Sequence, residues 1–331
     1  MCERLSRLQT TAWWDELGLS PTERIEWLWQ ELELSHAAVL FDCPVQQLFW
    51  ISSLGPDEIG VTDRILEDLE PHCERLGLPF ERYDPETADE FLKCLDNIIG
   101  RTTVGSLPMI HLDLHGSVKD GVRIAQSGEH VSWTVVADKF RSINVATGNN
   151  LCVISGACFS FEVVRQVDVN QPAPFFILVA PQTEVTAGIL EASVLGFYRD
   201  ILGREDLISA HERWFTDRLR LFHCERMLGV VLLRYIDMAC KGKNADDRRE
   251  YLVSMAMKNG LANTRKNRRM ARSFARKKSK PSEDLINRFV DTFLIGKRPN
   301  FTINQLNRFV DDARMSGTLS PREPFPFEVP D

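Results

Sequence analysis

Two residues with reactive side chains each follow a short apolar segment of the sequence. His115 comes directly after residues 109–114, and Cys158 comes after residues 150–157. Short apolar segments that stop at small residues are typical of buried strands in a parallel sheet. Because the carboxyl ends of such strands open on one crevice, two adjacent strands would bring these side chains together there. A thiol beside an imidazole predicts nucleophilic catalysis, in which the imidazole takes the thiol proton.

Each of these residues has a neighbour that could be mistaken for it. His111 lies four residues before His115, in the middle of the expected strand, and we expect it to be a buried core residue or one that supports the site from behind. Cys152 lies on the same strand as Cys158 and is expected to contribute packing only. A buried core thiol remains the alternative for Cys158. The small residues before it favour a sharp turn that exposes the side chain.

The order of these features resembles the caspase-like (clan CD) cysteine peptidases, and most closely the CHAT family of bacterial proteins and separases. The shared features are a strand ending in His-Gly at 115–116, a hairpin, and a strand ending in Ala-Cys-x-Ser at 157–160. Residues 175–181 then match the next core strand, and residues 186–200 match a helix with a Phe-Tyr pair near its end. The resemblance covers roughly residues 45–203. It implies an α/β fold, namely a three-layer α/β/α domain with a mostly parallel central sheet.

The resemblance also implies a role for each site residue. Cys158 would be the nucleophile and His115 the general base, and the N–H groups of Gly116 and Cys158 would form the oxyanion hole. Gly156 stands where many relatives have an aspartate that receives a basic substrate side chain. Cleavage after Arg or Lys is therefore not an expectation, although two other carboxylates at strand ends could substitute: Asp113 and Glu184.

The implied function is that of a cysteine endopeptidase acting on a protein substrate. A partner protein or a signal ligand would activate it, in the setting of anti-phage defence or programmed cell death that many bacterial CHAT proteins share. Two other classes stay open. A cysteine-type α/β-hydrolase elbow would need a histidine after Cys158 in the chain, where only His211 and His223 remain. An inactive caspase-like scaffold or sensor, binding a protein or nucleic acid through its C-terminal helices, would need no chemistry at all.

Composition narrows the classes of protein that need weighing. The chain has 331 residues, of which 44% are hydrophobic, enough for a large α/β domain with an added helical part. There is no apolar run of membrane-spanning length and no signal-peptide pattern, so we expect a cytoplasmic protein without membrane contact. The eight cysteines include no Cys-x-x-Cys pair, which argues against a zinc site or a disulfide framework. We expect no metal and no cofactor.

The pattern of elements predicts three regions. Residues 1–44 are expected to be a helical segment, with a capping box that places a helix over residues 21–34. Residues 45–203 are expected to hold the peptidase domain, with strands near 47–53 and 80–83, helices ending near 76 and 99, and a hairpin over 121–136 followed by a helix near 137–145. Residues 204–331 are expected to be helical, including one long helix over 206–240. The last stretch, 320–331, is rich in proline and expected to be extended.

The charge of the chain is unevenly distributed. Residues 241–280 contain 14 Lys and Arg against 3 Asp and Glu, a local charge of +11, whereas residues 1–240 carry a net charge of −16. The basic segment 258–280 is densest from Arg265 to Lys278. Docking on the acidic body or exposure to solvent is the expected role of this segment. Nucleic acid is a possible partner that the sequence does not favour.

Overall fold

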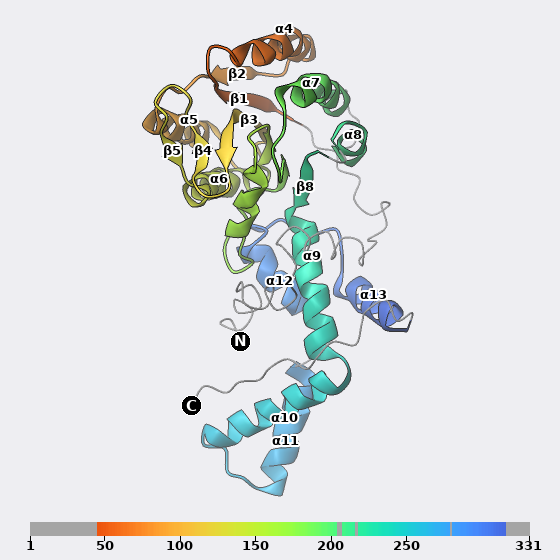
Figure 1. Cartoon of the computed structure of the whole chain (residues 1–331). Helices are drawn as coiled ribbons and strands as arrows, with labels where there is room; N and C mark the ends of the chain where they lie inside the picture. Colours follow the sequence, from red (N-terminus) through yellow and green to blue (C-terminus); the bar gives the residue numbers. More distant parts are fainter. Residues whose placement is uncertain (1–44, 204–206, 216–217, 279, 316–331) are drawn as a thin grey trace.

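The fold is taken from a computed structural model that describes residues 45–203, 207–215, 218–278 and 280–315 (Figure 1). The expected N-terminal segment 1–44 and the expected extended end 320–331 lie outside the described residues. In the part of the chain that the structure describes, no helix combines the length and the apolar character needed to cross a bilayer.

A mostly parallel sheet forms the centre of the molecule. Its order is β2-β1-β3-β6-β7-β8, and only β8 runs antiparallel to its neighbour along this path. The strands are β1 (Gln47–Ser53), β2 (Phe80–Tyr83), β3 (Pro108–Ser117), β6 (Cys152–Ser155), β7 (Ile177–Ala180) and β8 (Arg220–His223). The first two strands have the bounds that the sequence predicted. A parallel sheet with short helical connections confirms the α/β fold class.

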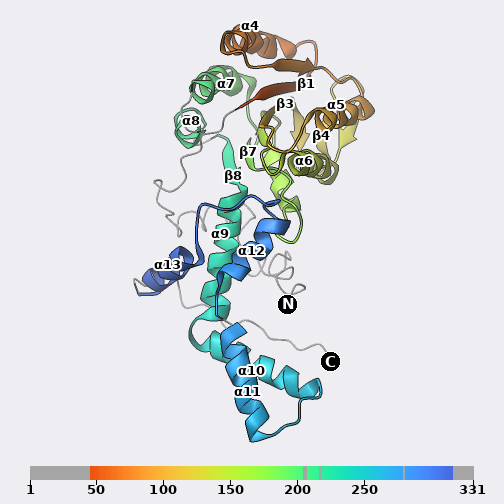
Figure 2. The same cartoon turned by 180° about the vertical axis from the view of Figure 1, so that it is seen from behind.

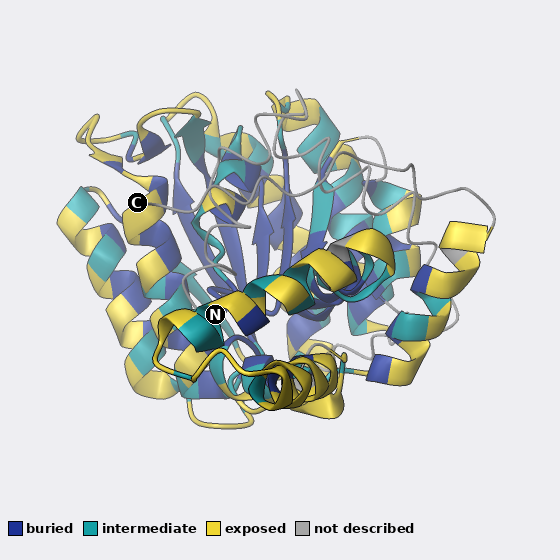
Figure 3. Ribbon diagram, turned by 90° about the horizontal axis from the view of Figure 1, so that it is seen from below, coloured by how far each residue is buried: buried dark blue, intermediate teal, exposed yellow. Residues whose placement is uncertain are grey.

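Helices cover both faces of the sheet, as Figure 3 shows by the dark blue strands between helices with exposed outer surfaces. One face carries α4 (Ile59–Leu76) and α7 (Ala187–Leu202), with α8 (Leu207–Trp214) beside α7. The other face carries α5 (Ala88–Arg101) and α6 (Trp133–Thr147). This arrangement is compatible with three layers, helices on either side of the sheet.

Local sequence explains where these helices begin and end. Gly77 ends α4 in the left-handed conformation (φ 66°), which glycine adopts without steric cost. The hydroxyl of Thr87 accepts a hydrogen bond from the amide of Glu90 at the start of α5. The hydroxyl of Ser132 caps α6 in the same way, so this helix begins at residue 133 and not near 137 as expected. The hairpin before it is correspondingly short: β4 spans Gly121–Arg123 and β5 spans His130–Val131.

The sheet does not end where the sequence placed the domain boundary. The predicted helix over residues 206–240 is instead α8, then β8, then α9 (Cys224–Tyr235). β8 pairs with β7 and buries Phe222 in the same core. The sheet therefore continues to His223, beyond residue 203, where the sequence placed the domain boundary. A four-residue edge strand gives too short a period-2 pattern to recognise between two helices.

The remaining helices follow α9 in chain order. They are η3, a π-helical turn (Ile236–Cys240), α10 (Gly242–Lys258), α11 (Arg265–Lys278), α12 (Glu283–Thr292) and α13 (Ile303–Met315). Helices α12 and α13 bury Phe289 and Leu306 in the main core. The Asn-Arg-Phe-Val-Asp sequence that occurs twice falls on these two amphipathic helices. In contrast, α10 and α11 form a helical hairpin at the end of the molecule away from the sheet (Figures 1 and 2).

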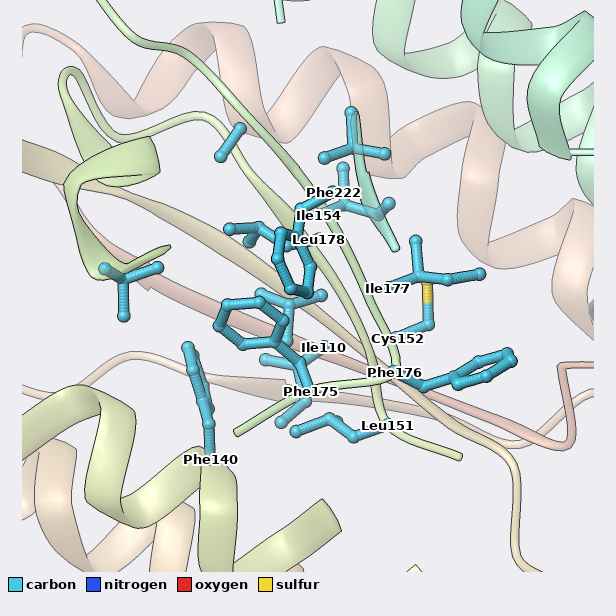
Figure 4. Packing of buried hydrophobic residues seen from close by; sticks show 14 of the residues in the cluster. Ile110, Phe140, Leu151, Cys152, Ile154, Phe175, Phe176, Ile177, Leu178 and Phe222 are labelled. Carbon is cyan, nitrogen blue, oxygen red and sulfur yellow. The ribbon is translucent and has the colours of Figure 1, made fainter. Parts of the chain in front are cut away.

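The core around the middle strands is apolar and rich in aromatic side chains. Figure 4 shows Phe140 of α6 beside Phe175, whose ring meets Phe222 edge to face at 5.2 Å. Cys152 is buried in this cluster near Ile177, where it serves as a small apolar residue. The same strand β6 that buries Cys152 leads directly into the loop that carries Cys158.

Candidate functional site

The connections of the sheet reverse direction at the carboxyl ends of β1 and β3. From β1 the chain crosses through α4 to β2 on one side, and from β3 it proceeds through α6 to β6 on the other side. Ligands of open α/β sheets bind at such points, where successive connections leave in opposite directions. His115 lies at the end of β3, and Glu58 lies in the loop that follows β1. The fold therefore places His115 at the location where a site is expected.

Glu58 is the hydrogen-bond partner of the His115 imidazole. Its Oε2 atom lies 2.8 Å from Nε2 of His115, and both side chains are partly exposed. This hydrogen bond, opposed by partial burial, lowers the pKa of the Glu58 carboxyl below its usual value; the Gly55 amide and the charges of His115 and Arg123 act in the same direction. A carboxylate that accepts from one ring nitrogen fixes the orientation of the ring and its tautomer. The other nitrogen, Nδ1, is then left for chemistry.

The loop of Cys158 rests directly on Gly116. A Cβ atom added to Gly116 would lie 2.1 Å from the carbonyl oxygen of Cys158, a distance at which no side chain fits. β3 and β6 are adjacent and parallel, so the loops that follow them meet at the same edge of the sheet. The glycine after the histidine is thus needed for close approach of two backbones. It joins the His115 strand to the Cys158 loop.

A tight turn presents the thiol. Phe159 adopts the left-handed conformation (φ 60°), which is uncommon for a residue with a side chain and is often found at functional sites. The Sγ atom of Cys158 accepts from the amide of Val185 at 3.4 Å and lies 3.6 Å from the carbonyl oxygen of Val185. The loop between β7 and α7 therefore holds the sulfur from one side, with an N–H where thiolate charge would form.

The amide of Cys158 is an unused donor. The amides of residues 156, 157, 159, 160 and 161 all donate hydrogen bonds, to Leu112, Ser155, Thr183, Ala157 and Pro181 respectively. Within the described residues, the Cys158 N–H donates to no acceptor. A donor left open beside a thiol in an otherwise satisfied turn is the arrangement that an oxyanion hole requires.

The thiol and the imidazole share an edge of the sheet but not a hydrogen bond. Among the described residues, His115 bonds to Glu58, and the sulfur contacts only the backbone of Val185. Catalytic hydrogen bonds commonly tighten only when substrate is bound, so this geometry is compatible with a dyad.

The other described thiols are poorly suited to nucleophilic chemistry. Burial raises the pKa of Cys73 and of Cys94 to about 11, and it raises the pKa of Cys224 further. Burial also raises the pKa of Cys240. Since the thiolate is the reactive form, these groups react slowly at neutral pH.

The candidate substrate-binding residues have different locations. Asp113 is 8% exposed beneath α4, where it accepts a hydrogen bond from the Thr62 hydroxyl, and burial raises its pKa. It is therefore part of the interior and does not line an open pocket. Glu184 is exposed and directly precedes Val185, so it lies beside the thiol. A Cβ atom on Gly156 would meet the end of the Leu190 side chain at 3.0 Å, so an aspartate there would need that side chain to move slightly.

His111 is a core residue, as the sequence predicted. Its ring stacks on Trp50 at 3.6 Å between centroids, and its Nδ1 lies 2.9 Å from the hydroxyl of Tyr198. Burial lowers the pKa of His111 to about 3, so the ring is neutral in the folded protein. It supports β3 from beneath the site.

The histidines that an α/β-hydrolase would need are at the wrong place. His223 ends the antiparallel strand β8 opposite Ile177, the first residue of β7. It therefore lies at the amino edge of the sheet, whereas Cys158 lies at the carboxyl edge. His211 bonds to the carbonyl of Leu219, away from the thiol. Of these three histidines, His115 is the one at the carboxyl edge of the sheet, where a general base for Cys158 would lie.

The groove along α4 and β2 lies apart from this site. A groove of about 650 Å³ runs along α4 and β2, lined by Glu67, Glu70 and Phe80 among others, but none of the site residues lines it. Among the described residues, no group of three or more His, Cys, Asp or Glu side chains is placed to hold a metal ion. The candidate site is thus a surface edge built of two loops.

Comparison with known proteins adds no family: no family model matches the chain, and no curated protein matches it. The class that fold and site define is an α/β protein with a thiol and a carboxylate-bound imidazole at the carboxyl edge of a parallel sheet.

Two contributors were missed at the sequence level, Glu58 and Val185. Glu58 follows β1, the strand next to β3, so the rule that neighbouring strand ends share an edge could have found it. Val185 contributes only its backbone, and no sequence signal identifies such a contact.

Proposed function

We propose that the chain is a caspase-like cysteine endopeptidase in which Cys158 and His115 form the catalytic dyad. The observation that carries the proposal is the unused N–H of Cys158, beside its own thiol and on the edge that presents His115. A structural cysteine turn has no need for an open donor. A thiol that forms a tetrahedral oxyanion does.

The mechanism follows from the positions of these groups. His115 takes the thiol proton, and the sulfur attacks the carbonyl carbon of the substrate peptide. The oxyanion is received by the amide of Cys158, with the amide of Gly116 as second donor. His115 then protonates the leaving amine, and water hydrolyses the thioester to regenerate the thiol. Glu58 stabilises the imidazolium that exists between the two proton transfers.

The substrate is a protein segment whose residue before the cleaved bond need not be basic. Leu190 covers the position where relatives have an aspartate, and Asp113 is buried, so Glu184 is the carboxylate left beside the thiol. Activation by a partner or signal and a role in anti-phage defence rest on the family resemblance, and a cytoplasmic location rests on the composition of the sequence.

The test uses a peptidyl acyloxymethyl ketone, which alkylates an activated thiolate. We expect wild-type protein to be labelled at Cys158, as located by mass spectrometry, with no labelling there in Cys158→Ala and at least about 100-fold slower labelling in His115→Ala. Cys152→Ala is the matched control, since Cys152 is a core thiol on the same strand. Equal labelling rates in wild type and His115→Ala would contradict the dyad.

A second candidate function is an inactive scaffold with the same fold. The observation in its favour is that the hydrogen bond of the imidazole goes to Glu58 and not to the thiol. An inactive protein would show labelling of Cys158 that is no faster than that of a free cysteine and is unaffected by His115→Ala.

A further inference from the structure

Helix α11 is an unusually basic element that the proposed peptidase site does not use. Over Arg265–Lys278 it contains eight Lys and Arg residues and no acidic residue. Like charges on one helix repel each other, and no i,i+4 partner on the helix relieves them. Such a charge needs a counter-charge from elsewhere.

The described part of the acidic body does not supply this counter-charge. Helix α11 packs on α10 through Ala271 and Ala275, whose small side chains join a cluster that also contains Val253 and is separate from the main core. The hairpin lies at the opposite end of the molecule from α4 (Figures 1 and 2). Among the described residues, the basic segment therefore does not dock on the acidic body.

The packing of α11 orients its cations outward. With Ala271 and Ala275 against α10, helical spacing places Arg265, Arg269 and Arg276 on the far side, where all three are exposed. Two lysines flank this row, Lys266 and Lys277. None of these five residues has an acidic partner among the described residues. Only Arg272, at the border with α10, forms an ion pair, with Glu250 at 2.8 Å.

The outward face has the dimensions of a polyanion contact. The residues from 265 to 277 rise about 18 Å along the helix, and a duplex carries one negative charge per about 1.7 Å of its axis. Arginine predominates, and its planar fork binds phosphate oxygens in pairs. Ser273 lies between the cations, and its small side chain allows a phosphate backbone to approach closely. The hairpin holds α11 away from the acidic body, which would repel a nucleic acid.

Other partners fit this face less well. An amphipathic membrane helix needs a broad apolar face, but the exposed apolar side chains of α11 are only Met270 and Phe274. A protein partner would ordinarily be met by charges of both signs, which fix register, and α11 has one sign only. A uniform row of cations fits a uniform row of anions.

We propose that the α10–α11 hairpin binds the phosphate backbone of a nucleic-acid duplex through the outward row Arg265, Arg269 and Arg276, without sequence preference. This proposal is independent of the peptidase site, because the hairpin lies at the end of the molecule away from the sheet (Figure 1), whereas Cys158 follows strand β6 of the sheet.

The experiment measures fluorescence anisotropy of labelled 20-base-pair DNA and RNA duplexes of mixed sequence at several salt concentrations, with full-length protein. We expect the affinity to fall steeply with salt. The variant Arg265→Gln, Arg269→Gln, Arg276→Gln should bind at least about tenfold more weakly and with a salt slope reduced by about 2 to 3. The DNA and RNA arms show which backbone is preferred.

The matched control changes the same number of charges elsewhere: Arg75→Gln, Lys93→Gln, Arg298→Gln, all exposed. It should bind like wild type, and both variants should keep the wild-type melting temperature. No binding at low salt, equal loss in both variants, or equally effective competition by polyglutamate would overturn the proposal. So would salt-sensitive self-association that depends on Glu67 and Glu70 of the acidic groove, because α11 would then bind a second copy of the chain.

Discussion

One nitrogen of the His115 imidazole is hydrogen-bonded to the carboxylate of Glu58. The Cys158 loop lies at the same edge of the sheet as His115. Glu58 is a positioning residue in this arrangement, since it contacts His115 and not the thiol. Its hydrogen bond fixes the orientation of the ring.

Glu58→Gln keeps a hydrogen-bonding group but removes the charge. We expect the rate of labelling by the peptidyl probe to fall by about tenfold or more, because a neutral amide orients the imidazole less firmly than a carboxylate does. Asp57→Asn, the neighbouring exposed acid, is the control and should be labelled at the wild-type rate. An unchanged labelling rate in Glu58→Gln would contradict a positioning role for Glu58.

Strand β3 is the element that joins core to site. His111, Asp113 and His115 alternate along it, so all three face the layer of α4 and α7. Burial decreases along this face: His111 is fully enclosed, Asp113 is nearly so, and His115 is partly exposed. One strand thus holds a neutral structural histidine and an accessible one within five residues.

The buried histidine makes stability depend on pH. The pKa of His111 is lowered to about 3 by burial, whereas an unfolded histidine has a pKa of about 6.5. Because the pKa of His111 is lower in the folded protein than in the unfolded chain, the free energy of unfolding decreases as the pH falls below about 6.5. The decrease is at most about 1.4 kcal/mol per pH unit.

In His111→Phe this dependence should disappear, although the hydrogen bond to Tyr198 is also lost. Urea unfolding gives the free energy of unfolding at pH 7 and at pH 5. The decrease from pH 7 to pH 5 should be about 2 kcal/mol smaller in His111→Phe than in wild type. His130→Gln, on the exposed end of the hairpin, should behave as wild type does. If His111→Phe and wild type lose the same stability, burial of a neutral His111 is contradicted.

The described residues form two packing units of unequal size. The main core runs from β1 to α13, while α10 and α11 rest on a small cluster of their own, which includes Val253, Met257 and Ala271. Stability of a helical hairpin with so little apolar contact is low, and its opening need not disturb the sheet. Binding of a nucleic acid would explain why the α10–α11 hairpin extends away from the main core.

Hydrogen exchange should show the division directly. Amides of α10 and α11 are expected to exchange much faster than those of β3 and β6. Ala271→Asp should accelerate exchange in both helices of the hairpin by burying a charge, with the melting temperature of the main body unchanged. Ser273→Asp adds the same charge on the exposed side of α11 and should leave exchange nearly unaltered. Uniform protection across the whole chain would mean that the hairpin is part of the main cooperative unit.

The sequence by itself determined the local features of this protein. The apolar run of β1, the alternating residues of β2, the glycine that ends α4 and the core position of His111 are set by residues close in the chain, so period and capping rules could predict them. The α/β class followed from the same runs. The rules also proposed His115 and Cys158 as a pair, because adjacent strands end on one edge.

Tertiary structure alone decided the rest. β8 is a strand only because the edge of β7 offers it partners, and its four residues carry no period of their own. Glu58, Val185 and the open amide of Cys158 gain their meaning from contacts between loops 27 or more residues apart, which no local pattern encodes. The sequence showed that α11 is basic, but which side of the helix faces outward depends on the packing of Ala271 and Ala275 against α10.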